Sequence, residues 1–209
     1  TAISSISWDD PNFPNIEGFG VWAAKCNFTM GPDGKMYSRM LGGNLVRIDV
    51  ENARGENLPN GDLVGTKDGS AYGLVFDPQD ENVFYFSNND KHCIYKYDLR
   101  TKECACWAGQ EGKSGYLDGP IGQAMFNKPG QMCVDSEGNI ILTDTANHCI
   151  RKITMSTGYV STLAGKPQNS GYVNGSAEDA QFKKPLGICI DNDDVMYLSL
   201  IHISEPTRL

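Results

Sequence analysis

Two histidines at a fixed spacing are the side chains in this sequence best suited to chemistry. His92 and His148 lie 56 positions apart, and each is followed by Cys and Ile. Imidazoles that recur at one position of a repeat could converge on a central axis as ligands. The alternative is a structural role, in which each imidazole hydrogen-bonds the backbone of its own turn. We favour the structural role because both histidines fall in predicted turns between strands.

Aspartates end predicted strands at equivalent repeat positions. Asp77, Asp135 and Asp191 each close an apolar run and precede a turn. An Asp at such a place usually accepts hydrogen bonds from backbone N–H groups of the turn, and we expect this rather than metal binding. Asp144 and Asn88 precede the next turn and are expected to cap it. A calcium loop needs several oxygen ligands at a tight spacing, which these segments do not provide.

Motifs for catalysis or cofactor binding are missing from the sequence. It contains no GxSxG nucleophile, P-loop, HExxH pair or Gly-rich dinucleotide turn. Its seven cysteines are odd in number and form no CxxC pair, which argues against a zinc knuckle and against a complete disulfide framework. Cys93 with Cys149, and Cys133 with Cys189, share the 56-residue spacing and are expected to pack as small apolar side chains. We therefore predict no catalytic residue, no metal and no cofactor.

Two tyrosines in glycine-rich linkers are the candidates for ligand binding. Tyr116 and Tyr172 repeat at the same spacing, and each is followed two residues later by a polar side chain, Asp118 or Asn174. Exposed rings at such positions would suit stacking on sugars or gripping a peptide. The alternative is that both rings pack over a neighbouring repeat. We expect Asp118-Gly119 and Asn174-Gly175 to form tight turns.

The elements that position these residues are repeated along the chain. A shift of 56 residues places Ala108-Gly109 on Ala164-Gly165, as well as the histidines and cysteines on their partners. Each copy holds four strand-length windows separated by Gly, Asn and Asp turns. In the two clearest copies the windows are 72–77, 82–87, 92–98 and 103–109, then 131–135, 139–144, 148–154 and 158–165.

Two further copies are less complete. A divergent first copy has apolar stretches in 19–28 and strands at 35–40 and 45–50, and a fourth begins at Pro185. Residues 52–69 are expected to form a polar loop with at most a short strand at Leu63-Val64. Four antiparallel strands per repeat is the size of one β-propeller blade. The predicted fold is therefore all-β, a partial propeller of four-stranded antiparallel blades, with about three and a fraction blades present.

Composition narrows the classes of partner. The 209 residues carry a net charge of −8 and an isoelectric point near 4.8, which disfavours binding to nucleic acid. No run of eighteen apolar residues exists, so we expect no transmembrane segment. A protein or glycan ligand is expected, and the sequence leaves the oligomeric state open.

The clearest copy resembles the NHL-repeat family. The resemblance is carried by Pro129-Gly130, Val134-Asp135, Gly138-Asn139, Thr143-Asp144, Asn147-His148, Ile150-Arg151-Lys152-Ile153 and Leu163-Ala164-Gly165. The long linkers are similar to those of Bacteroidetes-type members, in which a TIG domain often precedes the propeller. The resemblance implies a propeller over residues 19–197, and a setting at the surface or in the periplasm of a bacterium. Residues 1–18 would be a linker or the end of a preceding domain.

The C-terminal residues depart from this pattern. Residues 199–208, SLIHISEPTR, resemble a translated sequencing adapter. We therefore expect residues 198–209 to be non-native, and the propeller sequence to be cut at both ends.

Two functions are compatible with these observations. The first is a non-catalytic binding or scaffold module that recognises a glycan or a protein. The second is a lactonase-like or lyase-like propeller enzyme with a divalent metal in its central channel, which would need carboxylates, Asn or His from several blades. The lack of catalytic motifs favours the first.

Overall fold

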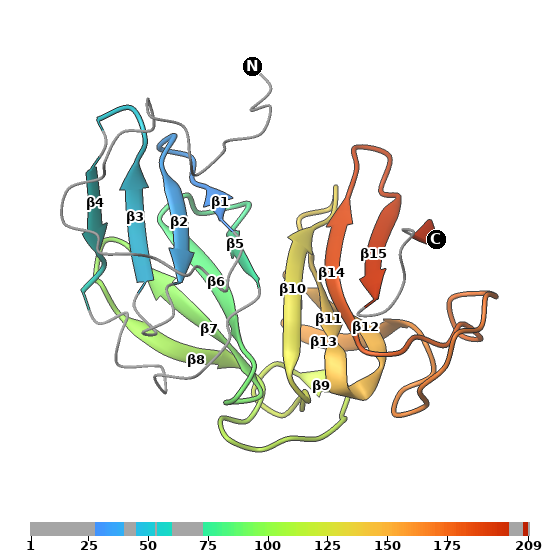
Figure 1. Ribbon diagram of the computed structural model, residues 1–209. Helices are drawn as coiled ribbons and strands as arrows, with labels where there is room; N and C mark the ends of the chain where they lie inside the picture. The colour runs from blue at the N-terminus through green and yellow to red at the C-terminus, as the bar shows by residue number, and fades with distance from the viewer. Residues whose placement is uncertain (1–27, 40–44, 53, 60–72, 201–206, 209) are drawn as a thin grey trace.

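The computed structural model describes residues 28–39, 45–52, 54–59, 73–200 and 207–208. These residues form β-sheets joined by turns and linkers, with one 3-10 turn, η1 (Thr145–Asn147), and no α-helix within the described ranges. Each sheet is antiparallel throughout and is built from strands that follow one another along the chain (Figure 1). The predicted all-β fold of four-stranded antiparallel blades is confirmed.

Four sheets follow in chain order, and we name them blades one to four. Blade one consists of β1 (Thr29–Met30), β2 (Met36–Arg39), β3 (Leu45–Asp49) and β4 (Arg54–Asn57). Blade two consists of β5 (Leu74–Phe76), β6 (Val83–Asn88), β7 (Cys93–Asp98) and β8 (Cys104–Ala108). Blade three consists of β10 (Pro129–Val134), β11 (Ile140–Asp144), β12 (Cys149–Thr154) and β13 (Tyr159–Ala164), to which β9 (Gly119–Pro120) is added at the outer edge. Blade four consists of β14 (Pro185–Ile190), β15 (Met196–Leu200) and β16 (Thr207–Arg208).

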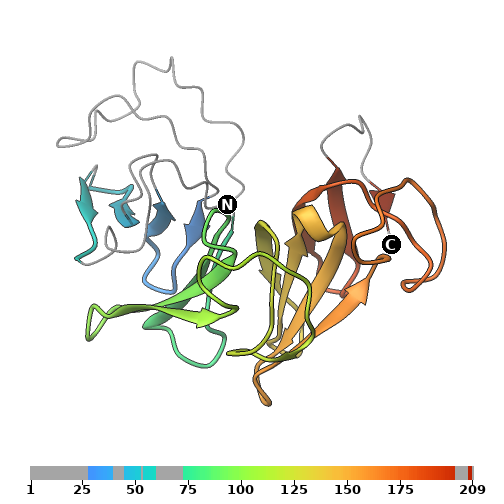
Figure 2. The ribbon, with the colours of Figure 1, turned by 90° about the horizontal axis from the view of Figure 1, so that it is seen from below.

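The hydrophobic cores lie between successive blades. Within β11, Ile140 and Leu142 belong to the cluster shared with blade two, whereas Ile141 belongs to the cluster shared with blade four. Because successive side chains of a strand point to opposite faces, a strand buried on both faces serves two cores at once. Figure 2 shows blade two, in green, standing beside blade three, in yellow to orange. Each blade is therefore stabilised by its neighbours, as in other repeat folds.

A tyrosine–aspartate hydrogen bond ties the second strand to the turn before it in three blades. Tyr37 donates to Asp33 over 2.9 Å, Tyr85 to Asp77 over 2.7 Å, and Tyr197 to Asp191 over 2.9 Å. Burial and the nearby carboxylate raise the pKa of Tyr37 to about 12, so the phenol remains a donor.

Blade three replaces this bond with an ion pair. Ile141 stands where the other blades have the tyrosine, and Lys152 pairs with Asp135 at 3.0 Å. The two arrangements hold the same turn aspartate by different donors.

Two strands appear where the sequence suggested loops or turns. Blade one ends with β4 at Arg54–Asn57, inside the segment predicted to be a polar loop, because its backbone pairs with β3 although its side chains are charged and polar. The predicted tight turn at Asp118-Gly119 is wrong, since Gly119 and Pro120 form β9 and pair with Val160 and Tyr159. The predicted strand at 63–64 and the apolar stretch at 19–27 lie outside the described residues.

The predicted segment boundaries stay predictions. Residues 1–18 fall outside the described ranges, and so does most of 198–209. Leu198 is buried within β15, and the backbone of β16 pairs with β15 at Leu198 and Tyr197. This pairing does not test the non-native origin of residues 198–209, which stays a prediction.

Candidate functional site

The linker before blade three brings Tyr116 and Asp118 onto the outer strands of that blade. Leu117 pairs with Met125 to make a small hairpin, and β9 then pairs with β13. This pairing places Asp118 beside Thr162, whose backbone N–H donates to the Asp118 carboxylate over 3.1 Å. The linker is thus ordered by backbone pairing, and its side chains meet the residues of β12 and β13.

Arg151 is the centre of this site. Its guanidinium is fully buried and donates to Asp144 over 2.8 Å and to Asp118 over 2.6 Å. It also donates to the carbonyl oxygens of Met125 over 3.1 Å and Leu117 over 2.9 Å. A planar guanidinium can satisfy several acceptors at once. Arg151 therefore fastens the linker hairpin to the middle of the blade.

Asp144 is the buried anion of this network. One carboxylate oxygen accepts the backbone N–H of Asn127 over 2.8 Å, and the other accepts the side-chain amide of Asn147 over 2.8 Å. Burial raises the pKa of Asp144 to about 6, while Arg151 and these hydrogen bonds act in the opposite direction. The predicted capping of η1 by the Asp144 side chain is therefore wrong: the carboxylate instead joins Asn147, Arg151 and the linker residue Asn127.

Tyr116 completes the network on its exposed side. Its ring lies 4.9 Å from the guanidinium carbon of Arg151, and its hydroxyl is 2.7 Å from the Thr162 hydroxyl. The structure therefore brings Tyr116 and Asp118 together, both in contact with Arg151. The Asp118 side chain is 36% exposed, so it reaches solvent as well as Arg151.

The second predicted pair, Tyr172 and Asn174, lies one repeat further along, in the linker before blade four. Here Tyr172 is 51% exposed, and the Lys183 ammonium lies over its ring, 5.7 Å from the ring centre. Asn174 is exposed as well. At the repeat positions of Asp118 and Arg151 the sequence has Asn174 and Thr207, which cannot form an ion pair. Tyr172 is therefore exposed beneath a lysine, whereas Tyr116 is partly buried against an arginine.

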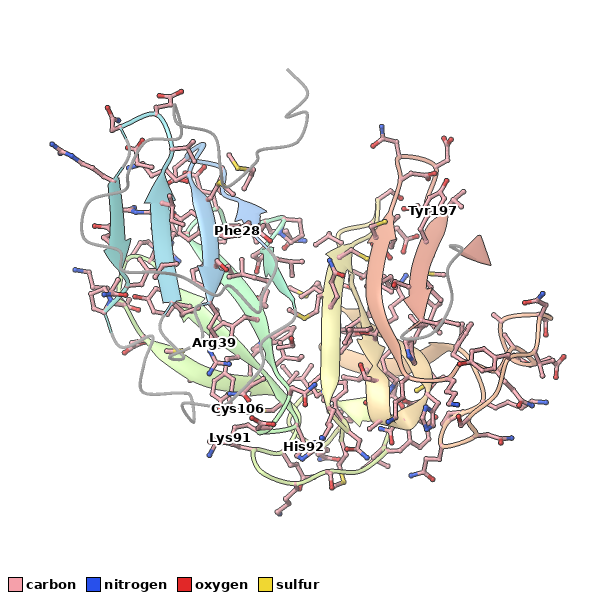
Figure 3. All side chains as sticks on the ribbon, viewed as in Figure 1. Phe28, Arg39, Lys91, His92, Cys106 and Tyr197 are labelled. Atoms are coloured by element: carbon pink, nitrogen blue, oxygen red, sulfur yellow. The ribbon has the colours of Figure 1, made fainter. Side chains whose placement is uncertain are left out.

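Each repeat histidine connects its blade to the next one. The Nδ1 atom of His92 accepts the backbone N–H of Lys128 over 3.1 Å, and Nδ1 of His148 accepts that of Lys184 over 3.1 Å. Each lysine lies 36 residues further along the chain than its histidine. The prediction that each imidazole bonds the backbone of its own turn is therefore wrong. Figure 3 shows His92 at the lower end of blade two, next to Lys91.

The histidine geometry requires a neutral ring. Both residues adopt a left-handed backbone conformation, with φ of 56° and 60°. Only the neutral imidazole has an acceptor nitrogen, so each of these two histidine–lysine hydrogen bonds, which we call the histidine latches, needs the uncharged ring. Burial lowers the pKa of both, helped by the nearby Lys128 and Lys184 ammonium groups.

The repeated aspartates and glycines lie at turns. Asp77, Asp135 and Asp191 each accept the backbone N–H two residues further on, over 2.9, 3.1 and 3.0 Å. Gly109 and Gly165 have φ of 95° and 92°, and a Cβ at either would fall within 3.0 Å of a phenylalanine ring. Glycine is the residue that fits both the φ and the space.

A hollow of about 450 Å³ lies along the first strands of blades one to three, lined by Phe28, Thr29, Gly73, Leu74, Gln131 and Met132. None of these six residues carries a carboxylate or an imidazole, the groups that a divalent cation prefers, so the lining does not fit such an ion. Within the described ranges no group of three or more His, Cys, Asp or Glu side chains is placed to hold a metal ion. The alternative of a propeller enzyme with a divalent metal therefore stays a prediction, and the described residues offer no site for that metal.

Sequence reasoning missed Arg151 as a central residue. The signal was present in the repeat, because blade two has Asn88 and Tyr95 where blade three has Asp144 and Arg151. Both members of the pair change together, as expected of two charges that are buried only as partners.

Comparisons with known proteins agree with this architecture. A family model described as "NHL repeat" matches residues 126–153. "NHL repeat-containing protein 2" from Bos taurus is 29% identical over 104 residues, which cover 49% of this chain and 14% of that protein. "Protein SUPPRESSOR OF QUENCHING 1, chloroplastic" from Arabidopsis thaliana is 27% identical over 163 residues, 74% of this chain and 15% of that protein. The chain thus matches about one seventh of the length of these curated relatives.

Solved structures share the fold over most of the chain. A structural genomics protein of unknown function from Bacteroides thetaiotaomicron has a TM-score of 0.71 and 24% identity, covering 83% of this chain and 44% of that chain. An "auxiliary nutrient binding protein" from the same organism has a TM-score of 0.67 and 25% identity, and the match covers 81% of this chain and 43% of that chain. Virginiamycin B lyase from Staphylococcus aureus has a TM-score of 0.55 and 18% identity, and the match covers 87% of this chain and 54% of that chain. The chain therefore contains an NHL repeat at residues 126–153 and is built from four-stranded blades of the β-propeller kind.

Proposed function

We propose that this chain is a non-catalytic binding or scaffold module that recognises a glycan or a protein through the linkers on the outer edge of its blades. The observation that carries the proposal is the half-exposed Tyr172, with the Lys183 ammonium over its ring and the exposed Asn174 two residues away. A flat aromatic face with adjacent hydrogen-bonding groups suits a sugar ring or a peptide.

The equivalent linker of blade three supports the same use of the edge. Leu117 and Val173 occupy the same repeat position and are 46% and 47% exposed. Each linker therefore presents one exposed apolar side chain at this position, and Val173 directly follows Tyr172 in the sequence. The likeness to a structure described as an auxiliary nutrient binding protein is compatible with a binding role and leaves the ligand open.

Binding of the full chain to a glycan array and to an immobilised peptide library tests the proposal. The Tyr172→Ala variant should lose the ligand that the unsubstituted chain retains. The control variant Phe28→Ala removes an exposed aromatic ring on blade one and should keep it. A correctly folded chain that retains no glycan or peptide would contradict the proposal, as would full binding by Tyr172→Ala.

The proposal extends to the setting of the protein. We propose that it acts at the surface or in the periplasm of a bacterium, after a TIG domain. No helix in the described part of the chain is long and apolar enough to cross a membrane. The uninterrupted gene would test the setting, because a missing export signal would contradict it.

A further inference from the structure

A groove of about 590 Å³ lies between blades one and two, at the turns that follow their first strands. We call it the turn groove. One wall is the β1–β2 turn and the other is the β5–β6 turn, and the residues that matter below are Met30, Pro32, Phe76, Asp77, Pro78 and Glu81. The Thr29 hydroxyl donates to the Leu74 carbonyl over 2.6 Å and so holds β1 against β5 below the groove. The two walls are thus fixed relative to each other.

The floor of the turn groove is apolar and rigid. The Phe76 ring packs edge-on against Tyr37, with 4.9 Å between ring centres, and lies 5.5 Å from Phe84. Met30 lies on the other wall and is 54% exposed, the largest exposed fraction among the exposed large hydrophobic side chains of the described residues. A flexible thioether in the same groove as an aromatic ring adapts to apolar side chains of different shapes. The groove therefore offers a ready place for a bulky apolar group.

The rim of the turn groove is acidic. Asp77 and Glu81 line it, and Asp33 and Asp80 lie in the same two turns. Asp33 and Asp80 are paired with arginines, Arg47 at 3.8 Å and Arg100 at 2.6 Å. Asp77 is held by neutral donors, the Tyr85 hydroxyl over 2.7 Å and the Gln79 N–H over 2.9 Å, and Glu81 is exposed. The rim therefore keeps negative charge beside the apolar side chains of Met30 and Phe76.

We infer that the turn groove docks a cationic peptide segment of a partner protein, with a bulky apolar side chain over Phe76 and a Lys or Arg beside Asp77 and Glu81. An apolar floor with an acidic rim is complementary to that chemistry. The chain as a whole carries a charge of −8, so nucleic acids and anionic membranes are repelled from the same surface. The volume lies in the range of pockets that hold small ligands or a few side chains.

Titration calorimetry with a defined peptide tests this inference. The probe is acetyl-Gly-Lys-Leu-Phe-Lys-Gly-amide, added to the full chain at low and at high salt. We expect binding that weakens with salt, because the ion pairs at the rim are partly exposed. A peptide with Glu in place of Lys, and another with Ser in place of Leu and Phe, should each bind at least about fivefold more weakly.

Matched variants locate the site. Glu81→Lys and Met30→Ser should each raise the Kd for the peptide about fivefold. Glu178→Lys makes the same charge change on the linker before blade four, and Val50→Ser removes another apolar side chain that is 42% exposed. Both controls should leave the Kd unchanged.

Three results would overturn the inference: no heat of binding at peptide concentrations on the order of 1 mM, equal binding of the Glu peptide, or equal weakening by the control variants. The turn groove uses no residue of the proposed linker site. Failure of one proposal therefore leaves the other standing.

Discussion

Replacing Arg151 with methionine would leave Asp144 buried without its cation. Methionine fills a similar volume with a flexible apolar side chain but donates no hydrogen bond. The variant loses the donors to Asp144 and Asp118 and to the carbonyl oxygens of Leu117 and Met125. The linker hairpin is then attached to the blade through fewer polar contacts, and a carboxylate remains inside.

The expected loss is dominated by the buried pair. Both side chains are completely buried, and removing one partner of such a pair costs about 3–5 kcal/mol. The Asp118 side chain is 36% exposed, so its pairing with Arg151 adds at most about 1 kcal/mol. The total, about 3–6 kcal/mol, is a large share of the roughly 5–15 kcal/mol that stabilises a typical domain.

A double variant separates the buried charge from other effects. Asp144→Asn removes the charge while its amide oxygen can still accept the Asn127 N–H. Blade two already has a neutral pair, Asn88 and Tyr95, at these positions. We expect the Asp144→Asn/Arg151→Met variant to be about 2 kcal/mol more stable than Arg151→Met alone, although Asp144→Asn alone destabilises the chain.

Urea unfolding of the full chain at pH 7.5, followed by circular dichroism and by Trp107 fluorescence, measures these differences. Agreement between the two probes is required before free energies are compared. Lys152→Met is the matched control, since the neighbouring Lys152 is partly exposed and pairs with Asp135 and Glu137, and its loss should stay near 1 kcal/mol. A cost below 1 kcal/mol for Arg151→Met, or a double variant as unstable as the sum of the single variants, would refute the reasoning.

Three further predictions concern the latches, the blade ends and the tyrosine–aspartate bonds. Folding favours the neutral forms of His92 and His148, whose folded pKa values lie below the unfolded value of about 6.5; their stabilisation is therefore complete above that pH and is lost as the pH falls through the folded pKa. The urea midpoint should drop between pH 7.5 and 5.5, and His92→Gln/His148→Gln should flatten that drop; an unchanged pH profile would count against the latches. Gly165→Ala should lower the free energy of unfolding by about 1–3 kcal/mol, because Gly165 has a φ of 92° and an added Cβ would lie 2.8 Å from the Phe182 ring. Gly122→Ala is the control and should cost little in the same assay, since nothing lies within 4 Å of an added Cβ there. Equal costs for the two variants would argue against strain at Gly165. Tyr85→Phe removes the 2.7 Å bond to Asp77 and should cost about 1–2 kcal/mol in urea unfolding, and no measurable loss would mean that water replaces the phenol.

The local patterns of the sequence determine the strands of blades two to four. Windows of alternating or continuous apolar residues between Gly, Asn and Asp turns predict β6, β7, β10 and β12 to within a residue or two. The 56-residue repeat also predicts which strands of successive blades are equivalent, because the same residues at the same spacing form the same turn. These features depend on neighbours within a few positions along the chain, which is why one sequence suffices to find them.

Tertiary structure alone decides which distant groups meet. The segment at β4 is polar and has no strand pattern, and it becomes a strand because β3 offers a free edge. His92 and His148 were expected to bind their own turns, but the start of the next blade supplies the N–H donor. Arg151 meets Asp118 only because β9 pairs with β13 and carries the linker across the blade. Contacts between residues so far apart in the sequence depend on how the sheets pack and on the path of the linkers between them. The periodicity of a single segment predicts neither.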